Sequence, residues 1–292
     1  MKSKVFFTSK LEPQSLINLY NVLGKELPGK VAVKLHSGEK GNQNYLKPEF
    51  LKDIIEYVNG TVVECNTAYM GARNTTKKHM KLMEYHGWST NFNVDILDSE
   101  EEMILENPNG EVIKKNYVGS KMKDYDSLLV LSHFKGHPMG GFGGALKNLS
   151  IGLASSQGKR YIHCSGKYKA SYLDMFSADH DSFLISMGDA CKTITDYFKG
   201  NIVYINAMVN MSVDCDCCVN AKAPCMKDIG ILASLDPVAL DQACIDLVYN
   251  SKDPGRDTLV DRIESKNGLL TIDSAEKQNV GTKEYELINI DN

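Results

Sequence analysis

Short apolar segments alternate with segments of helical periodicity along most of this chain, and this order limits the folds that it can adopt. Runs of β-branched and aliphatic residues predict buried strands, whereas apolar residues that recur every three or four positions predict helices. The predicted strands cover residues 31–35, 61–64, 127–132, 201–208 and 229–234, and the predicted helices cover residues 48–58, 75–86, 145–154, 182–199 and 236–249. This alternation predicts an α/β fold with a mostly parallel or mixed sheet and flanking helices, arranged as one body or as two intimate lobes around a cleft.

Composition restricts the class of protein and its partners. The chain has 292 residues, of which 42% are hydrophobic and 24% are charged, enough for a large buried core. The formal net charge of -4 gives no general attraction for nucleic acid or for an anionic membrane, so neither is an expected partner. The first ten residues have too short an apolar run for a signal peptide, and no segment has the roughly 18 apolar residues of a membrane span. We therefore expect a cytoplasmic protein; the sequence carries no indication of its oligomeric state.

Three polar loops, at residues 36–44, 132–148 and 214–225, each follow a predicted strand. Ligands of open α/β sheets bind at the carboxyl ends of strands, so we expect these loops to line one cleft. The loop at residues 36–44 contains His36, a candidate proton carrier, and Lys40, a candidate anion-binding residue; a flexible turn is the alternative. Arg73, in the loop after residues 61–64, is either a bidentate ligand of a carboxylate or phosphate group or a solvated arginine.

The loop at residues 132–148 has five glycines, two histidines and two lysines between a predicted strand and a predicted helix. Glycines let the backbone approach a ligand closely, and amides at a helix N-terminus favour negative charge, so the loop predicts a site for a small anionic ligand. Tight structural packing is the alternative. The candidate proton carriers are His133 and His137, and the candidate anion-binding residues are Lys135, Gly141, Gly143, Lys147 and Asn148. Gly136 and Pro138 argue against a shared helix face for the two histidines, which excludes the helical zinc motif of metalloproteases.

Four of the eight cysteines lie within eleven residues, at Cys215, Cys217, Cys218 and Cys225. If the segment is extended, Cys215 and Cys217 point to one face and Cys218 to the other. A reducing cytosol favours metal binding, redox chemistry or burial over disulfides. The spacing matches neither a ferredoxin run nor a double Cys-x-x-Cys zinc site. An iron–sulfur cluster, zinc or another soft metal, and reduced thiols with a structural or redox role therefore all stay open.

Three separate parts of the chain resemble the family catalogued as domain of unknown function 362. They are residues 33–42, residues 133–137 with 141–148, and the Cys215-Asp216-Cys217 motif with residues 228–243. The resemblance implies a single domain over residues 3–275, with residues 276–292 as a C-terminal extension packed on it, and an association with iron–sulfur clusters.

Many members of that family carry a ferredoxin-like insertion with two runs of cluster-binding cysteines. In this chain the corresponding residues 164–181 are short and contain no such run, so a ferredoxin-type pair of clusters is not expected. The resemblance covers Cys215 and Cys217 but does not extend to Cys218 and Cys225.

Three functions are compatible with these patterns. The first is a metal or iron–sulfur binding protein, redox-active or cofactor-related, with a cleft between the His/Lys/Gly loop and the Cys-Asp-Cys loop. The second is an enzyme that acts on a small carboxylate or phosphate by His/Lys acid–base chemistry; a likeness in architecture to nickel-dependent lactate racemases suggests hydroxy-acid chemistry as one form of it. The third is a non-catalytic interaction module whose cysteines are buried.

Overall fold

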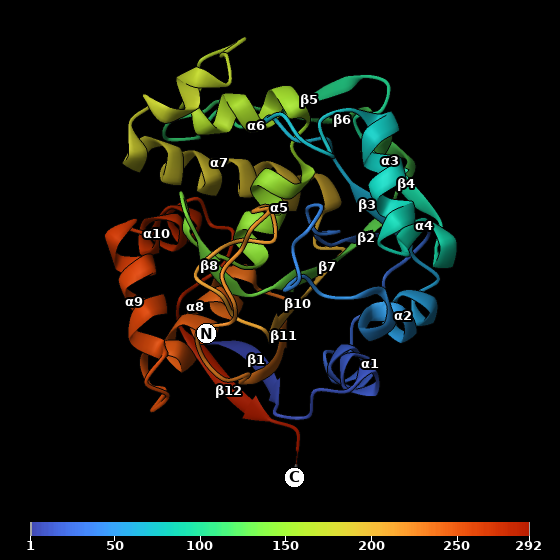
Figure 1. Cartoon of the computed structure of the whole chain (residues 1–292), viewed down its shortest axis with the longest axis vertical. Helices are drawn as coiled ribbons and strands as arrows, with labels where there is room; N and C mark the ends of the chain where they lie inside the picture. The colour runs from blue at the N-terminus through green and yellow to red at the C-terminus, as the bar shows by residue number, and fades with distance from the viewer. Residues whose placement is uncertain (1, 292) are drawn as a thin grey trace.

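Eight strands form the central sheet of the computed structural model, which describes residues 2–291, and helices cover both faces of that sheet (Figure 1). The strand order is β12-β1-β11-β10-β7-β2-β3-β4. The five strands from β10 to β4 are parallel to one another, β11 is antiparallel to both of its neighbours, and β12 pairs with β1 in parallel. The predicted α/β fold with a mixed, mostly parallel sheet is confirmed.

The strands of the large sheet are β1 (Ser3–Thr8), β2 (Val31–Lys34), β3 (Thr61–Glu64), β4 (Val94–Ile96), β7 (Ser127–His133), β10 (Ile202–Met208), β11 (Gly230–Ser234) and β12 (Tyr285–Asn289). Two small antiparallel sheets are formed by β5 (Glu102–Glu106) with β6 (Lys115–Gly119) and by β8 (Lys135–His137) with β9 (Gly141–Gly143). The helices are α1 (Pro13–Val22), α2 (Pro48–Tyr57), α3 (Thr76–Tyr85), α4 (Trp88–Asn91), α5 (Ala145–Leu153), α6 (Ser156–His163), α7 (His180–Phe198), α8 (Pro237–Tyr249), α9 (Arg256–Ser265) and α10 (Leu269–Lys277), with short 3-10 turns at Ser120–Asp124 and Leu173–Phe176. Every strand and helix predicted from the sequence is present.

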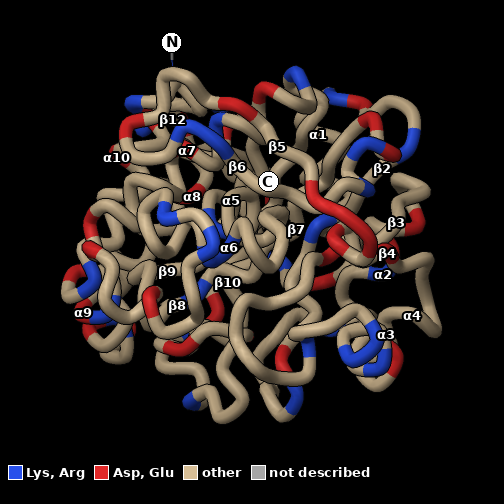
Figure 2. Tube along the Cα trace, turned by 90° about the horizontal axis from the view of Figure 1, so that it is seen from above, with Lys and Arg blue, Asp and Glu red and all other residues tan. Residues whose placement is uncertain are grey.

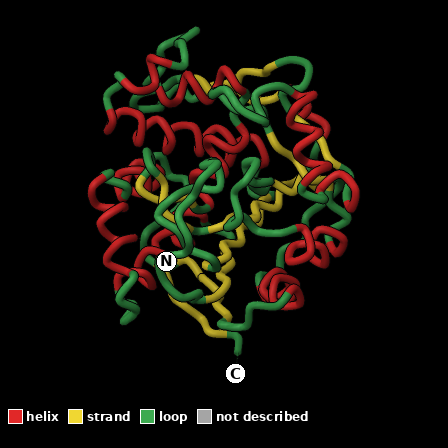
Figure 3. Tube along the Cα trace, in the orientation of Figure 1, coloured by secondary structure: helices red, strands yellow, loops and turns green. Residues whose placement is uncertain are grey.

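Helices and strands form three layers, as their colours in Figure 3 show. Alternate residues of the buried strands contribute to two separate cores, because successive side chains of a strand point to opposite faces. One core packs α1, α2 and the α3–α4 region against the sheet, with Trp88 fully buried. The other packs α5, α7, α8, α9 and α10 against the opposite face. Burial on both faces explains why the central strands are apolar without alternation.

The glycine-rich segment predicted as a loop forms a β-hairpin, made of β8 and β9, that leads directly into α5. The prediction of an irregular loop is therefore wrong for part of this segment. The hairpin approaches the segment after β10 closely: the amide of Gly136 donates to the carbonyl of Ser212 at 2.8 Å. A Cβ at Gly136 would overlap the backbone of Val213, so only glycine permits this approach.

Lys and Arg residues are scattered among Asp and Glu residues along the chain (Figure 2). None of the helices among the described residues is both long and apolar enough to cross a membrane.

Candidate functional site

A cavity of about 410 Å³ lies where β10, β7, β2 and β3 end. These four strands are adjacent and parallel, so the segments that follow them meet at one edge of the sheet, as the sequence predicts. The predicted site residues that line the cavity are His36, Arg73, His133, Lys135, His137, Gly143, Lys147, Asn148, Cys215, Cys217 and Cys218.

Three predicted site residues lie elsewhere. Lys40 is exposed and does not line the cavity. Gly141 has a φ of 78°, and a Cβ there would lie 2.8 Å from the Cα of Gly268, so this glycine serves packing of the hairpin. Cys225 points its thiol at the carbonyl of Met211, at 3.3 Å, and is not part of the cysteine group at the cavity.

The cysteine-bearing segment is a turn and not an extended strand. The amide of Cys218 donates to the carbonyl of Cys215 at 2.9 Å, which is the bond that closes a β-turn. Asn42, from the loop after β2, donates its side-chain amide to the carbonyls of both residues, at 2.9 Å to Cys218 and 3.2 Å to Cys215. The cysteine segment is therefore not extended, and side-chain contacts from the loop after β2 fix its turn.

Asp216 anchors this turn to the end of β7 through buried charges. Its carboxylate lies 2.9 Å from Nδ1 of His133 and 2.8 Å from Nζ of Lys135. Burial alone would raise the pKa of Asp216, but His133 and Lys135 hold it well below its usual range. Asp216 is thus a carboxylate held between the His133 ring and the Lys135 ammonium group, and it fixes the positions of the cysteines on either side of it.

The cavity wall also contains a second buried ion network, next to the first: the amide of Glu39 donates to the carbonyl of Asp216 at 2.9 Å. Nζ of Lys34 lies 2.9 Å from Oε2 of Glu64, and the Arg73 guanidinium lies 3.3 Å from Glu39 and 3.6 Å from Glu64. Burial alone would raise the pKa of Glu64, but Lys34 and Arg73 hold it well below its usual range. Arg73 is therefore neither a solvated arginine nor free for a ligand, because its charge already faces carboxylates; its Nη2 also donates to Tyr69 at 2.8 Å.

Asn148 also uses its side-chain amide within the protein and not for a ligand. Its side-chain amide donates to the carbonyl of Leu131 at 3.1 Å and to the hydroxyl of Ser132 at 3.0 Å, which ties α5 to β7. Among the predicted anion-binding residues, Lys147 is the cation that lines the cavity without a hydrogen bond or ion pair to any residue of the described part of the chain.

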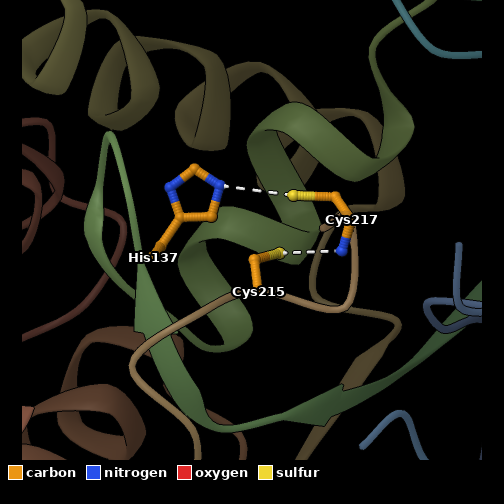
Figure 4. A group of neighbouring side chains, drawn as sticks. All are labelled: His137, Cys215 and Cys217. Carbon is orange, nitrogen blue, oxygen red and sulfur yellow. Dashed lines mark hydrogen bonds between the residues drawn. The ribbon is translucent and has the colours of Figure 1, made fainter. Parts of the chain in front are cut away.

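His137, Cys215 and Cys217 form the group best suited to hold a metal ion. One ligand atom from each residue lies within 4.8 Å of the others, and the three side chains converge from the β8–β9 hairpin and the cysteine turn (Figure 4). Nε2 of His137 faces Sγ of Cys217 at 3.8 Å. Thiolate sulfur and imidazole nitrogen are donors that zinc and other soft metals prefer. Cys218 lines the same cavity but lies outside this group.

Both thiols of the group are protonated in the metal-free protein. The hydrogen bond with Cys217, together with burial, raises the pKa of Cys215 to about 11. For Cys217 the contact with Cys215 lowers the pKa, but the contact with Cys218 and burial outweigh it and raise the pKa to about 11. A metal ion would have to displace these protons, as is general for thiolate ligands.

Hydrogen bonds determine which of the predicted proton carriers can accept a proton. The two ring nitrogens of His133 face oxygen atoms, those of the Asp216 carboxylate at 2.9 Å and the Val209 carbonyl at 2.6 Å, so neither nitrogen points a lone pair into the cavity. Nδ1 of His137 accepts from the amides of Met139 and Gly140, at 3.2 and 2.8 Å, so the proton of the neutral ring is on Nε2. Neither histidine leaves a ring lone pair free to act as a base.

His36 has the same arrangement as His137. Its Nδ1 accepts from the amide of Gly38 at 3.1 Å, and burial and then Arg73 lower its pKa well below the usual range. The neutral ring therefore carries its proton on Nε2 and acts as a donor. All three histidines predicted as proton carriers are thus held as hydrogen-bond donors.

His163 differs from these three histidines because one of its ring nitrogens keeps a free lone pair. It is not among the site residues predicted from the sequence. It lines the cavity from the end of α6. Its Nδ1 donates to the carbonyl of Lys159 at 2.7 Å, which leaves the Nε2 lone pair free. Burial lowers its pKa to about 4, and the carbonyl of Lys159 opposes this shift while Lys147 and Lys159 add to it. The spacing of Lys159 and His163, four residues apart on one helix, is the sequence signal that could have identified this face.

Comparisons with known proteins give a family and two partial structural likenesses. Residues 31–246 match the model of the family described as domain of unknown function (DUF362). The lactate racemase apoprotein from Thermoanaerobacterium thermosaccharolyticum is 17% identical with a TM-score of 0.43, over 69% of this chain and 50% of that chain. A protein from Thermotoga maritima is 11% identical with a TM-score of 0.44, over 91% of this chain and 58% of that chain. The chain thus spans between half and three fifths of these proteins, and no curated protein matches it.

Proposed function

The chain belongs to the family described as domain of unknown function 362, and we propose that it is a metal-binding protein in which Cys215 and Cys217 hold one soft metal ion at the wall of a ligand cavity. The observation that carries this proposal is the convergence of two thiols and one imidazole within 4.8 Å. A single ion suits this group better than a four-iron cluster, because such a cluster takes four cysteine ligands and Cys218 and Cys225 lie outside the group.

The surroundings of the thiols support a rigid site. Asn42 holds the backbone of the turn, and Asp216 ties it to β7 through His133 and Lys135. Supporting contacts of this kind orient ligands and raise metal affinity. A bound ion would supply Lewis acidity to a ligand in the adjoining cavity.

We infer that His137 donates a hydrogen bond to the thiolates and does not itself bind the metal. Metal-bound histidines usually donate their second ring nitrogen to an acceptor, whereas Nδ1 of His137 accepts from two amides. Its Nε2 proton therefore faces Cys217, where it stabilises negative charge on the sulfur. Direct coordination by His137 would need these two amide bonds to break.

Anaerobic purification, metal analysis and a visible spectrum test the proposal. We expect about one zinc or similar soft ion per chain, lost in Cys215→Ser and in Cys217→Ser and retained in the matched controls Cys218→Ser and Cys225→Ser. His137→Ala should keep a full equivalent at saturating metal but bind it about 10 to 100 times more weakly, as for loss of a supporting contact. Folded wild-type protein without metal would overturn the proposal. Bound iron with charge-transfer bands would show that the site holds an iron–sulfur cluster and not a single ion.

A second candidate function is an enzyme that transfers protons on a small carboxylate, and the free Nε2 of His163 is the observation that favours it. The other candidate histidines are held as donors, so His163 is the one suited to accept a proton. Hydrogen–deuterium exchange at carbon in a panel of small carboxylic acids, followed by mass spectrometry, tests this function. Exchange should occur with wild-type protein and stop in His163→Gln; equal exchange by the two proteins would contradict a role for His163.

A further inference from the structure

We infer that the cavity binds a small ligand with two negative charges, a dicarboxylate or a phosphomonoester, and that Lys147 and Lys159 hold those charges. This inference goes beyond metal binding and rests on the two lysines alone. A divalent ion bound by two thiolates is neutral overall, so the charge that the lysines present to a ligand is the same with or without it.

The charges around the cavity do not balance within the protein. Lys34, Arg73 and Lys135 each have a carboxylate within 4.0 Å, and together they use Glu64, Glu39 and Asp216. Lys147 and Lys159 also line the cavity, but neither has a carboxylate partner among residues 2–291. Two cations, the buried Lys159 and the half-buried Lys147, therefore line one cavity without a carboxylate partner.

Lys159 is the more deeply buried of the two, with 8% of its surface exposed. Its ammonium group donates to the carbonyl of Ala154 at 2.5 Å. This bond uses one of its three hydrogen-bond donors, but a neutral carbonyl does not balance its positive charge. Burying an unpaired charge is costly, so we expect a bound anion to compensate Lys159, with the half-buried Lys147 as its neighbour on the same cavity. The lysines therefore define a preformed site for negative charge.

The elements that carry the lysines direct both toward the same space. Lys147 lies in the first turn of α5 and Lys159 in the middle of α6, and these two helices follow one another at the cavity wall. Both lysines contribute to the lowered pKa of His163, which indicates that their charges act on the same region. The ring of His163 stays neutral there, so it neither adds to nor balances the positive charge.

The remaining wall limits the rest of the ligand. Apolar side chains line the cavity as well: Met139, Ile151 and, from the segment around the 3-10 turn, Tyr172, Met175 and Phe176. A volume of about 410 Å³ is in the range of sites for small metabolites. We therefore expect a ligand whose anionic groups meet the lysines and whose carbon skeleton lies against the apolar side chains.

Calorimetric titration and thermal unfolding with succinate, inorganic phosphate and acetate test the inference. Succinate or phosphate should bind and raise the unfolding temperature, whereas the monoanion acetate should do so much more weakly. Which of the two dianions binds more tightly identifies the carboxylate or the phosphate class. Failure of both dianions to bind would overturn the inference.

Lys147→Gln and Lys159→Gln test the lysines directly, with the exposed Lys40→Gln as the matched control. Loss of a hydrogen bond to a charged group corresponds to roughly 10-fold to 100-fold weaker binding for each cavity variant, and Lys40→Gln should bind like wild type. Without ligand, both cavity variants should unfold at a higher temperature than wild type, because an uncompensated charge is removed. Unchanged affinity in both cavity variants would refute the assignment.

Metal content separates this inference from the metal-binding proposal. The lysine variants should keep the metal content of wild type, and Cys215→Ser should keep the response to the dianion. Loss of metal in Cys215→Ser with unchanged dianion binding supports two independent sites. The opposite result is that Cys215→Ser no longer binds the dianion while Lys147→Gln binds it as tightly as wild type. This result would show that the anion binds to the metal, and it would overturn the role of the lysines.

Discussion

Replacement of Glu64 by glutamine should destabilise the protein strongly although it changes the side chain by a single group. Glu64 accepts from Lys34 at 2.9 Å and lies 3.6 Å from Arg73, and both members of the Lys34 pair are at most 3% exposed. Oε1 of a glutamine can still accept from Ser37, but its amide would place a donor against the Lys34 ammonium. Removing one partner of a buried ion pair costs about 3 to 5 kcal/mol.

The loss should also depend on pH. The pKa of Glu64 in the folded protein lies well below its ordinary value of 4.5, because the effect of burial, which raises it, is outweighed by Lys34, His36 and Arg73 acting together. A carboxyl group with a lowered folded pKa contributes stability that is fully present above the ordinary value and is lost as the pH falls through the folded pKa. The difference between wild type and Glu64→Gln should therefore be largest near neutral pH and narrow below pH 4.5.

Calorimetry and chemical denaturation at several pH values measure this difference. At about 2 °C per kcal/mol for a chain of this size, the midpoint at neutral pH should fall by about 6 to 10 °C. Glu56→Gln is the matched control, because Glu56 is 57% exposed and its pair with Lys52 should contribute at most about 0.5 kcal/mol. A fall of less than about 2 °C for Glu64→Gln, or a difference that widens toward low pH, would refute the reasoning.

Three further predictions concern other parts of the structure. Nitrogen NMR at neutral pH should find the proton of His137 on Nε2 and that of His163 on Nδ1; the reverse tautomers would contradict the hydrogen bonds described above. Asp189→Ala should lower the free energy of unfolding by about 2 to 4 kcal/mol, because three backbone amides of the β5–β6 connection lose their acceptor. The control Asp196→Ala, at an exposed position, should change it by less than about 0.5 kcal/mol. Denaturant titrations measure both values. Gly136→Ala should unfold at a lower temperature and bind metal less well, because its methyl group would push the hairpin away from the cysteine turn; metal affinity equal to wild type would show that the close approach is not needed.

The outline of the fold could be predicted from local patterns. Strands such as β2, β7 and β10 are short apolar runs whose burial on both faces removes any alternation, and α8 begins at an Asp-Pro pair in which Asp236 caps the helix by accepting from Val238 and Ala239. These signals depend on residues close in sequence. They therefore appear in the chain before any tertiary contact is known.

The short β8–β9 hairpin and the cysteine turn could not be predicted in the same way. Gly136 indicates a close approach but not its partner, which is the backbone of Val213, before the cysteines. The turn at Cys215 depends on Asn42, which is 173 residues away in sequence. Contacts over such distances have no periodicity that a single sequence displays.

By itself, the sequence determined the α/β architecture and the gathering of polar loops at the carboxyl edge of the sheet, because both follow from strand order and local hydrophobicity. Only the tertiary structure decided what each polar side chain does there. Arg73 is neutralised by Glu39, while Lys147 lines the cavity without a carboxylate partner among the described residues, although the two residue types offer similar signals in sequence. Likewise, which ring nitrogen of His137 or His163 holds the proton depends on backbone groups that only folding brings within reach.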